Sequence, residues 1–333
     1  MRAFKLASGY LIPALGFGTW NIPAENAAAL VEMSIRAGYR HIDCAAGYGN
    51  EAQVGEALTI CMKEGIVKRE DLFVTSKLWL TNLTPERVRP ALEKSLQDLN
   101  LAYLDLLLVH WPVVLKEGHD FPPKKEDMIP LQDCPTHATW AEMQKAVDDG
   151  LVRSIGTSNY SAKKLNDLLK HPNTRIPPSV NQMECHPYSQ LKDLKKYCDA
   201  KNIHLTGYSP LGSPARPDDV SKRTDEPLLL EDPTIQEISK KHGISPAQFL
   251  IHWGAVDGGH SVLCKSSSLE RMKLNIASLD AFTLDEDDKR KINELDRQHR
   301  YLTGEFWVQP DGPYTLENIW DDNVPVESLL SSE

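Results

Sequence analysis

The sequence repeats one pattern eight times: a short apolar segment that predicts a β-strand is followed by a longer amphipathic segment that predicts an α-helix. The expected strands cover residues 14–17, 41–43, 72–76, 104–110, 154–156, 179–181, 204–208 and 261–263. The expected helices cover residues 25–37, 51–63, 85–99, 139–148, 162–169, 191–200, 233–241, 246–256 and 269–277. Because a helix between two strands returns the second strand parallel to the first, the pattern predicts an α/β fold with eight parallel strands.

Three of these helices have a clear start signal, a side chain that can cap a helix followed by a proline. The three pairs are Thr84-Pro85, Asp232-Pro233 and Ser245-Pro246. Proline suits the first helical position, because the N–H group that it lacks would have no partner there. We therefore expect helices to begin at these prolines.

Eight parallel strands can close into a (β/α)8 TIM barrel or lie in an open, doubly wound sheet. An open sheet that binds a dinucleotide places a Gly-x-Gly-x-x-Gly turn after its first strand. Residues 16–26 read GFGTWNIPAEN, with Gly16 and Gly18 but no third glycine at the start of the helix. The sequence therefore favours a barrel, which typically needs about 250 residues, as one domain over residues 1–333.

Several segments extend the barrel beyond its repeating units. The first dozen residues alternate around a turn at residues 8–9, which predicts an N-terminal hairpin. Residues 112–137 and 211–230 are long loops that follow strands, so they should lie at the C-terminal face, where barrels build their sites. Residues 285–295 predict another helix, and residues 301–333 predict an irregular C-terminal tail whose aromatic rings pack near the mouth of the site.

The balance of charges limits the classes of function. Lysine and arginine number 37 against 47 aspartates and glutamates, which argues against binding to nucleic acid or to an anionic membrane as the main activity. The chain has no apolar run of the ~20 residues that a membrane helix needs, and its first residues lack a signal-peptide block. Its six cysteines form no CxxC pair. We expect a cytoplasmic monomer with reduced thiols and no metal ion.

Four ionisable residues stand at or just beyond the ends of the expected strands: Asp43, Tyr48, Lys77 and His110. Strand ends converge in a barrel, so these groups can shift one another's pKa. Lys77 would make the Tyr48 phenol a better acid, Asp43 would keep the lysine charged, and His110 would hydrogen-bond a substrate oxygen. Each residue alone has a structural alternative, an ion pair or a packed loop ring. The four together favour a catalytic site.

Eight motifs occur in order at a spacing that fits a barrel: LGFGTW (15–20), GYRHIDCAAGYGNE (38–51), LFVTSKLW (72–79), YLDLLLVHWP (103–112), GLVRSIGTSNY (150–160), NQMECHPY (181–188), GYSPLGS (207–213) and CKSSSLERMKLN (264–275). Through these motifs, residues 10–300 resemble the aldo-keto reductase superfamily. The resemblance implies a β/α barrel that reduces an aldehyde or aldose to the alcohol with NADPH. It also implies that Tyr48 is the general acid, that Lys77 and Asp43 tune it, and that His110 orients the carbonyl.

The same resemblance implies a site for the nicotinamide half of NADP(H). Ser158, Asn159 and Gln182 offer hydroxyl and amide groups for the nicotinamide carboxamide. Tyr208 offers a ring face on which the nicotinamide can stack. Three further residues, Gly18, Thr19 and Trp20, are also implied to bind the cofactor.

A second group of residues is implied to hold the phosphates and the adenine. The loop over the pyrophosphate would begin with Ser209, Leu211 and Ser213. The 2′-phosphate would lie among Lys265, Ser266, Ser267 and Arg271, because ammonium and guanidinium groups suit phosphate. Asn275, one helical turn beyond Arg271, would face adenine.

The chain departs from the family pattern at four positions. Ala215 stands where an acidic residue normally latches the pyrophosphate loop, and Leu274 stands where an acidic residue meets the adenine amine. Cys264 replaces a proline, and Gly47 replaces a bulkier residue of the substrate pocket. We therefore expect a weaker latch on the cofactor and a roomier pocket beside Gly47.

The substrate pocket would be lined by Trp20, Trp79, His110 and Trp111. Indole rings suit apolar or aromatic aldehydes, although sugars also lie well against them. The loop 112–137 and the tail should decide between these small carbonyl compounds.

Two other functions fit a barrel of this kind. One is a sensor or regulatory subunit that binds the cofactor with little turnover, but such a protein has no need for a tuned phenol. The other is a sugar-phosphate isomerase or aldolase, since a fold alone does not fix chemistry. Those reactions need a carboxylate base or a Schiff-base lysine, without a nicotinamide site.

Overall fold

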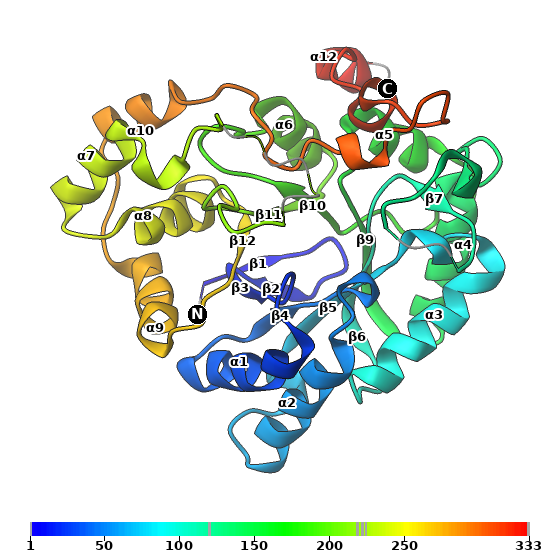
Figure 1. The fold of residues 1–333 in the computed structure, drawn as a ribbon, viewed down its shortest axis with the longest axis horizontal. Helices are drawn as coiled ribbons and strands as arrows, with labels where there is room; N and C mark the ends of the chain where they lie inside the picture. Colours follow the sequence, from blue (N-terminus) through cyan, green and yellow to red (C-terminus); the bar gives the residue numbers. More distant parts are fainter. Residues whose placement is uncertain (1, 119–120, 218–219, 221–222, 224, 332–333) are drawn as a thin grey trace.

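The computed structural model describes residues 2–118, 121–217, 220, 223 and 225–331. Eight parallel strands close into a barrel in the order β10-β11-β12-β3-β4-β5-β6-β9, which confirms the (β/α)8 TIM barrel (Figure 1). The barrel strands are β3 (Leu15–Gly18), β4 (His41–Asp43), β5 (Phe73–Leu78), β6 (Leu104–Val109), β9 (Val152–Ser158), β10 (Val180–Glu184), β11 (His204–Tyr208) and β12 (Ser261–Cys264). All eight lie within a few residues of the ranges that the apolar runs predict.

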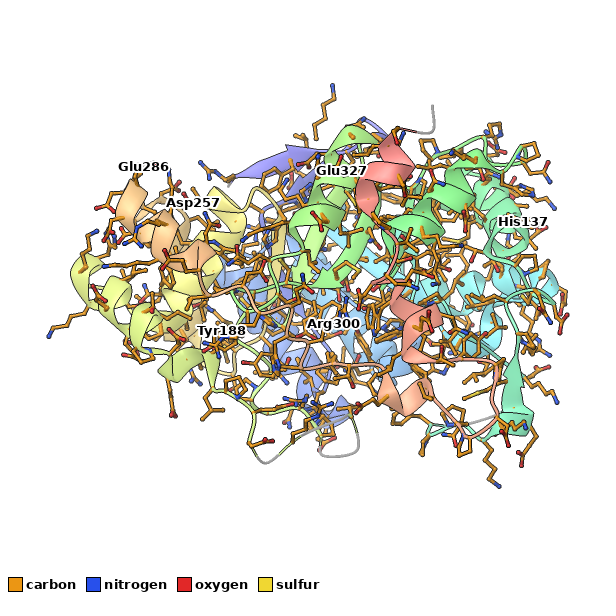
Figure 2. All side chains as sticks on the ribbon, turned by 90° about the horizontal axis from the view of Figure 1, so that it is seen from above. His137, Tyr188, Asp257, Glu286, Arg300 and Glu327 are labelled. Carbon is orange, nitrogen blue, oxygen red and sulfur yellow. The ribbon has the colours of Figure 1, made fainter. Side chains whose placement is uncertain are left out.

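A ring of helices surrounds the strands, because each helix has one apolar face to bury (Figure 1). These helices are α1 (Ala24–Ala37), α2 (Glu51–Lys63), α3 (Pro85–Asp98), α4 (Thr136–Asp148), α5 (Ala162–Lys170), α6 (Lys192–Ala200), α7 (Pro233–His242), α8 (Pro246–His252), α9 (Leu269–Ala277) and α10 (Glu286–Asn293). Figure 2 shows Glu286 of α10 and His137 of α4 at opposite ends of the long axis of the molecule.

Two of the three expected start signals cap their helices. Asp232 Oδ1 accepts the backbone N–H of Thr234 at 2.8 Å, and Ser245 Oγ accepts that of Gln248 at 3.3 Å. The Thr84 hydroxyl instead donates to the Glu86 carboxylate, so α3 begins at its proline without a side-chain cap.

The predicted helix 246–256 is regular only as far as His252. A π-helical turn, Trp253–Asp257, follows it. The His260 ring packs against this turn so closely that a Cβ at Gly254 or Gly258 would lie 2.9 or 2.8 Å from it. The wider turn leaves room for this buried ring, which the local sequence pattern does not reveal.

The N-terminal hairpin forms as predicted, from β1 (Ala3–Lys5) and β2 (Leu11–Pro13). Ile12 is fully buried and belongs to an apolar cluster with Phe73, Leu106 and Val180 of three barrel strands. The hairpin therefore packs against the interior of the barrel at the end where the barrel strands begin. A second antiparallel pair, β7 (Val114–Leu115) and β8 (Met128–Ile129), forms inside the long loop after β6.

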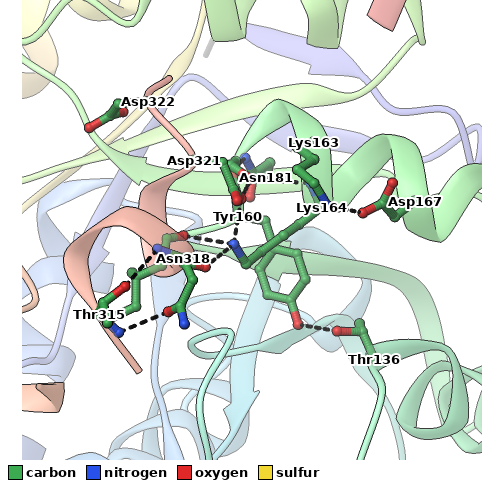
Figure 3. A network of polar contacts seen from close by, with 12 residues as sticks. Thr136, Tyr160, Lys163, Lys164, Asp167, Asn181, Thr315, Asn318, Asp321 and Asp322 are labelled. Carbon is green, nitrogen blue, oxygen red and sulfur yellow. Dashed lines mark hydrogen bonds and ion pairs between the residues drawn. The ribbon is translucent and has the colours of Figure 1, made fainter. Parts of the chain in front are cut away.

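The tail is less irregular than the sequence indicates. It contains two short helices, α11 (Leu316–Trp320) and α12 (Val326–Leu330). The side chain of Lys164 donates to the backbone oxygens of Asn318 and Ile319 and pairs with Asp321, which holds the C-terminal end of α11 on α5 (Figure 3). These contacts are long-range, so the local periodicity of the tail does not predict its helices.

The short 3-10 helices are η1 (Ala46–Tyr48), η2 (Arg69–Asp71), η3 (Leu80–Asn82), η4 (Lys125–Asp127), η5 (Leu229–Glu231), η7 (Ser278–Asp280) and η8 (Glu305–Trp307). Within the described ranges, no helix is both long and apolar enough to cross a lipid bilayer. Among the same residues, no three His, Cys, Asp or Glu side chains are grouped so that they could hold a metal ion.

Candidate active site

The four ionisable residues expected at the strand ends lie together. Asp43 ends β4 opposite Thr75 of β5, and Lys77 stands two residues farther along β5, so its side chain points the same way. Lys77 Nζ donates to Asp43 Oδ1 at 2.6 Å and to the Tyr48 hydroxyl at 3.1 Å. His110 directly follows β6, and its ring lies 5.5 Å from that of Tyr48.

Burial sets the charge state of these groups. Lys77 and Asp43 are 1% and 3% exposed. Burial is the largest single effect and would lower the pKa of the Lys77 ammonium, but the interactions with Asp43 and Tyr48 together outweigh it and raise that pKa above its ordinary value. Burial also raises the pKa of Tyr48 to about 12, and Lys77 only partly offsets this effect. Lys77 does lower the pKa of this phenol, as expected, but desolvation is the larger effect, so the pKa of Tyr48 stays above its ordinary value.

His110 is neutral in this environment. Burial, and secondly the charge of Lys77, lower its pKa well below the ordinary value. Its Nδ1 atom is buried with no hydrogen-bond partner, and its backbone oxygen accepts from Asn159 Nδ2 at 3.0 Å. Trp79 packs edge-on against the imidazole with ring centroids 5.3 Å apart. The ring is thus fixed by packing beside the Tyr48 hydroxyl.

The polar residues expected at the nicotinamide form one network with the ion pair. Gln182 Nε2 donates to Asp43 Oδ2 at 2.8 Å, and Ser158 Oγ donates to the Gln182 backbone oxygen at 3.0 Å. The Tyr208 hydroxyl donates to Asn159 Oδ1 at 2.7 Å. The link from Gln182 to the Asp43–Lys77 pair was not foreseen, because nothing in either motif marks a contact between β4 and β10.

The segment after β3 contributes support and open space. Thr19 is fully buried, and its hydroxyl donates to the Asp43 backbone oxygen at 3.0 Å. A Cβ built on Gly18 would meet no atom within 4 Å. Trp20, two residues after Gly18, is half-buried. Thr19 therefore positions the end of β4, while Gly18 leaves room for a ligand.

The residues expected at the 2′-phosphate and adenine cluster after β12, but three of them, Lys265, Asn275 and Ser266, already have hydrogen-bond partners; Ser266 Oγ accepts the Ser268 N–H at 3.1 Å. Lys265 Nζ donates to the backbone oxygens of Asn21 and Trp20 at 3.0 and 3.3 Å, and burial lowers its pKa. Asn275 directs its amide nitrogen to the Cys264 sulfur, 3.7 Å away. Ser266, Ser267 and Arg271 surround the start of α9.

Described residues of the loop after β11, residues 211–230, make contacts that the sequence did not reveal. Asn21 Nδ2 donates to the Ala215 backbone oxygen at 3.1 Å, in place of the acidic latch. Arg216 forms a buried ion pair with Glu226 inside the loop. At the base of the loop, near Leu211, the Ser213 hydroxyl donates to that of Ser209. The sequence also offers three charged residues of this loop as substitutes for the latch, and these lie outside the described residues: Asp218, Asp219 and Lys222.

An aromatic wall closes the site on the side of the tail. The wall consists of Trp79, Trp111, Phe121, Phe306 and Trp307. Trp307 is 1% exposed, and its ring centroid lies 6.1, 5.9 and 5.4 Å from those of Trp79, Trp111 and Phe121. The roomier pocket expected beside Gly47 is wrong, because a Cβ there would lie 2.3 Å from the Trp79 indole. Trp79 occupies the space that Gly47 leaves.

Comparison with known proteins agrees with this geometry. Residues 14–297 match the Aldo/keto reductase family. The chain is 47% identical over 322 residues to Aldo/keto reductase slr0942 of Synechocystis, with 97% of each chain covered. It is 43% identical to aldo-keto reductase family 4 member C11 of Arabidopsis thaliana, covering 96% of this chain and 98% of that protein. It is 41% identical to prostaglandin F synthase 1 of Bos taurus, covering 94% and 97%. The chain belongs to the aldo/keto reductase family.

Proposed function

We propose that this protein reduces an aldehyde to the alcohol with NADPH and that Tyr48 supplies the proton. Members of the family are generally NADP-dependent carbonyl reductases, which supports the reaction class. The observation that carries the proposal is the row of contacts from Asp43 through Lys77 to Tyr48, with neutral His110 beside it. A sensor or an isomerase has no use for this arrangement.

The residues present fit NADPH. A Cβ on Gly18 would meet no atom within 4 Å, which leaves room for a ligand after β3, and Arg271 of α9 offers a cation for its phosphate. When bound, NADPH supplies the hydride that reduces the carbonyl carbon. Asn159 and Gln182 orient the nicotinamide, and Arg271 pairs with the 2′-phosphate.

Tyr48 keeps its proton until the substrate needs it. With a pKa of about 12, the phenol is protonated throughout the neutral range, so it can donate a hydrogen bond to the carbonyl oxygen. Negative charge develops on that oxygen during reduction, and the proton then moves from Tyr48 to it. Lys77, 3.1 Å from the phenol oxygen, stabilises the phenolate that remains. Neutral His110 donates a second hydrogen bond, which fixes the orientation of the carbonyl.

The aromatic wall supports an aldehyde with a flat apolar body as the preferred substrate. Five aromatic side chains enclose this part of the site, and ring edges and faces stabilise other rings more than hydroxyl-rich chains. We expect kcat/KM to be higher for 4-nitrobenzaldehyde than for xylose, glucuronate, glyceraldehyde or a sugar phosphate. A preference for xylose or glucuronate would overturn this choice of substrate and leave the reaction intact.

We also propose that the protein works in the cytoplasm as a monomer. The exposed large apolar side chains of the described residues come from four separate segments: Tyr10 and Leu11, Leu228, Leu269 and Leu274, and Leu316. Light scattering should give a mass near 37.4 kDa. A mass of twice this value would show a dimer.

The first test is Tyr48→Phe, which removes the hydroxyl and keeps the ring. We expect NADPH to bind as before, measured by nicotinamide fluorescence, while carbonyl reduction falls at least ~10²-fold, as for the loss of a general acid. Tyr10→Phe, at an exposed tyrosine of the N-terminal hairpin, is the matched control. Near-normal turnover of Tyr48→Phe would exclude the assigned role, and absence of NADPH binding by the unaltered protein would exclude the function.

A further inference from the structure

The segment that carries Tyr48 is attached to both faces of β5. Ser76 and Lys77 are neighbours on this strand, so their side chains point to opposite sides of the sheet. On the side facing the barrel interior, Lys77 Nζ donates to the Tyr48 hydroxyl at 3.1 Å. On the side facing the helices, the Ser76 hydroxyl donates to Glu51 Oε1 at 2.5 Å. Because Glu51 follows Tyr48 by only three residues, one strand holds this segment at two points.

Glu51 is a buried carboxyl group, 5% exposed, at the first position of α2. Its second oxygen, Oε2, accepts a hydrogen bond from the Ser95 hydroxyl of α3 at 2.8 Å. Helices α2 and α3 are neighbours outside the barrel (Figure 1). Burial raises the pKa of this carboxyl, and the two hydroxyl groups only partly offset the effect. Each carboxyl oxygen thus has its own donor, one from β5 and one from α3.

Asn50, one residue earlier, attaches the same segment to the end of β3. Its side chain is buried, and Nδ2 donates to the backbone oxygens of Thr19 and Ile22, both at 3.0 Å. Thr19 in turn donates to the Asp43 backbone oxygen through its own N–H and its hydroxyl, both at 3.0 Å. The segment is therefore held beside Asp43 as well as beside Lys77.

The contact with Tyr48 is the longest of the three that the Lys77 ammonium makes. Its Nζ atom lies 2.6 Å from Asp43 Oδ1, 2.8 Å from the Cys44 backbone oxygen and 3.1 Å from the Tyr48 hydroxyl. Tyr48 ends η1, a single 3-10 turn, and such a short turn has little stability of its own. Asp43 and Cys44 would keep the ammonium in place if the turn moved. The Tyr48 contact therefore depends on the residues that hold the turn.

We propose that Glu51 is a positioning residue: through its hydrogen bond with Ser76, it keeps the Tyr48 hydroxyl within hydrogen-bonding distance of Lys77. This inference rests on the proposed function, in which Tyr48 gives its proton to the substrate and Lys77 stabilises the phenolate that remains. Without the bond between Ser76 and Glu51, the segment after Tyr48 loses its attachment to β5, and the hydroxyl should move away from Lys77. Proton transfer should then slow. Substrate affinity should change little, because the side chains of Glu51 and Ser76 lie outside the barrel interior.

The decisive variant is Ser76→Ala, which removes the donor on β5. Its matched control is Ser95→Ala, which removes the donor to the other oxygen of the same carboxyl group and leaves the bond to β5 in place; both serines are buried. Because each change removes one hydroxyl hydrogen bond, the two variants should lose similar stability in urea unfolding. Only Ser76→Ala should slow the chemical step, by about three- to ten-fold, while KM for 4-nitrobenzaldehyde changes little.

Single turnovers separate this chemical step from the release of NADP⁺. When excess protein loaded with NADPH is mixed with 4-nitrobenzaldehyde, Ser76→Ala should react more slowly than the unaltered protein. It should also show a larger solvent deuterium isotope effect, because proton transfer then limits the rate more. Ser95→Ala should match the unaltered protein in both measurements, and Ser76→Thr, which restores a hydroxyl donor, should recover the rate. Equal rates in the two alanine variants, or no recovery in Ser76→Thr, would overturn the inference.

A structural measurement tests the inference without turnover. In crystals of Ser76→Ala, the distance from Lys77 Nζ to the Tyr48 hydroxyl should increase beyond about 3.5 Å, outside hydrogen-bonding range. In crystals of Ser95→Ala, it should stay near 3.1 Å. If the unaltered protein reduces no carbonyl compound, the proposed function is wrong, and these two distances still decide the inference. If the protein is active and the distance is the same in both variants, the function stands and the inference does not.

Discussion

Lys77 and Asp43 illustrate how one buried pair can serve both stability and chemistry. Lys77→Met should lower carbonyl reduction at least ~10²-fold, because nothing then stabilises the Tyr48 phenolate. It should also lower the free energy of unfolding by about 3–5 kcal/mol, because the Asp43 carboxylate stays buried without its cation.

The double variant Lys77→Met/Asp43→Asn separates the two effects. It removes the unpaired charge, so urea unfolding should show much of the lost stability restored, while activity stays low. Recovery of both properties would mean that Lys77 acts only by neutralising Asp43. Recovery of neither would point to a packing defect at these positions.

Arg271 and Lys265 should differ in what they recognise. Arg271→Ala should weaken NADPH binding by about one to two decades and change NADH affinity little, because a charged hydrogen bond to the 2′-phosphate is worth roughly 1.5–3 kcal/mol. Lys265→Met should weaken both cofactors, because Lys265 also holds the backbone of Trp20 and Asn21. Titration of tryptophan fluorescence with each cofactor measures these affinities. Equal losses for both cofactors in Arg271→Ala would show that it does not read the phosphate.

The positions of some site residues could be predicted from the sequence, and those of others could not. Asp43, Lys77 and His110 were predictable, because parallel strands bring their ends to one face and these residues stand at strand ends. The closeness of Trp79 to Gly47 was not, because it depends on how one indole ring packs. The rise in the Tyr48 pKa was missed for a related reason: burial, the larger effect, is a property of the folded surroundings.

Among the elements, we predict that the loop 211–230 sets how quickly the cofactor leaves. The sequence predicts a weak latch, with hydride transfer at least partly rate-limiting, because Ala215 and Leu274 lack the acidic groups of relatives. The structure supplies a neutral substitute in the hydrogen bond from Asn21 to the Ala215 backbone. Loop opening can limit turnover in enzymes with such lids. The strength of this hydrogen bond should therefore affect the rate at which NADP⁺ is released.

Asn21→Gly tests that contact without straining the backbone, because Asn21 has a φ of 55°, which glycine readily adopts. NADP⁺ release should become about two- to ten-fold faster. The isotope effect on kcat with 4-deuterated NADPH should then increase and any transient burst should shrink. Asn202→Gly, at a φ of 54° after α6, is the matched control. A clear burst without an isotope effect in the unaltered protein would show that release is slow despite the weak latch.

The helices and strands could be predicted wherever the pattern of buried side chains can be read from neighbouring residues in the sequence. All eight barrel strands and the helices between them follow from apolar runs and 3.6-residue periodicity. The π-helical turn after α8 depends on the buried His260 ring, and α11 depends on Lys164 from another helix. Such partners are distant in sequence, so no window of local residues can reveal them.

At the scale of the whole molecule, buried neutral histidines should make the fold sensitive to acid. Burial lowers the pKa of His41 and of His260 to about 4, against about 6.5 when exposed. The stability that their neutral forms contribute is complete above pH 6.5 and is lost as the pH falls toward 4. Between pH 7 and pH 5, each should cost about 2 kcal/mol of the free energy of unfolding, roughly 4 kcal/mol together.

Urea unfolding at pH 7 and pH 5 measures this loss. His41→Asn, which keeps a polar group near Thr75, should reduce the difference between the two pH values by about 2 kcal/mol. His137→Asn, on the outer face of α4, is the comparison that should leave most of the difference in place. Equal stability of the unaltered protein at both pH values would mean that neither buried ring is forced to stay neutral.

Glu184 holds the start of the tail by accepting hydrogen bonds from the backbone N–H groups of Tyr301 and Leu302, and this affects how sequences of such barrels can vary. Glu184 binds two backbone N–H groups, which every residue except proline possesses, and so it does not read the side chains that follow. The anchor can thus remain constant while the residues of the wall change. We therefore predict that residues 303–315 can be exchanged: transplanting this stretch from a relative should transfer substrate preference and leave the chemistry at the strand ends unchanged.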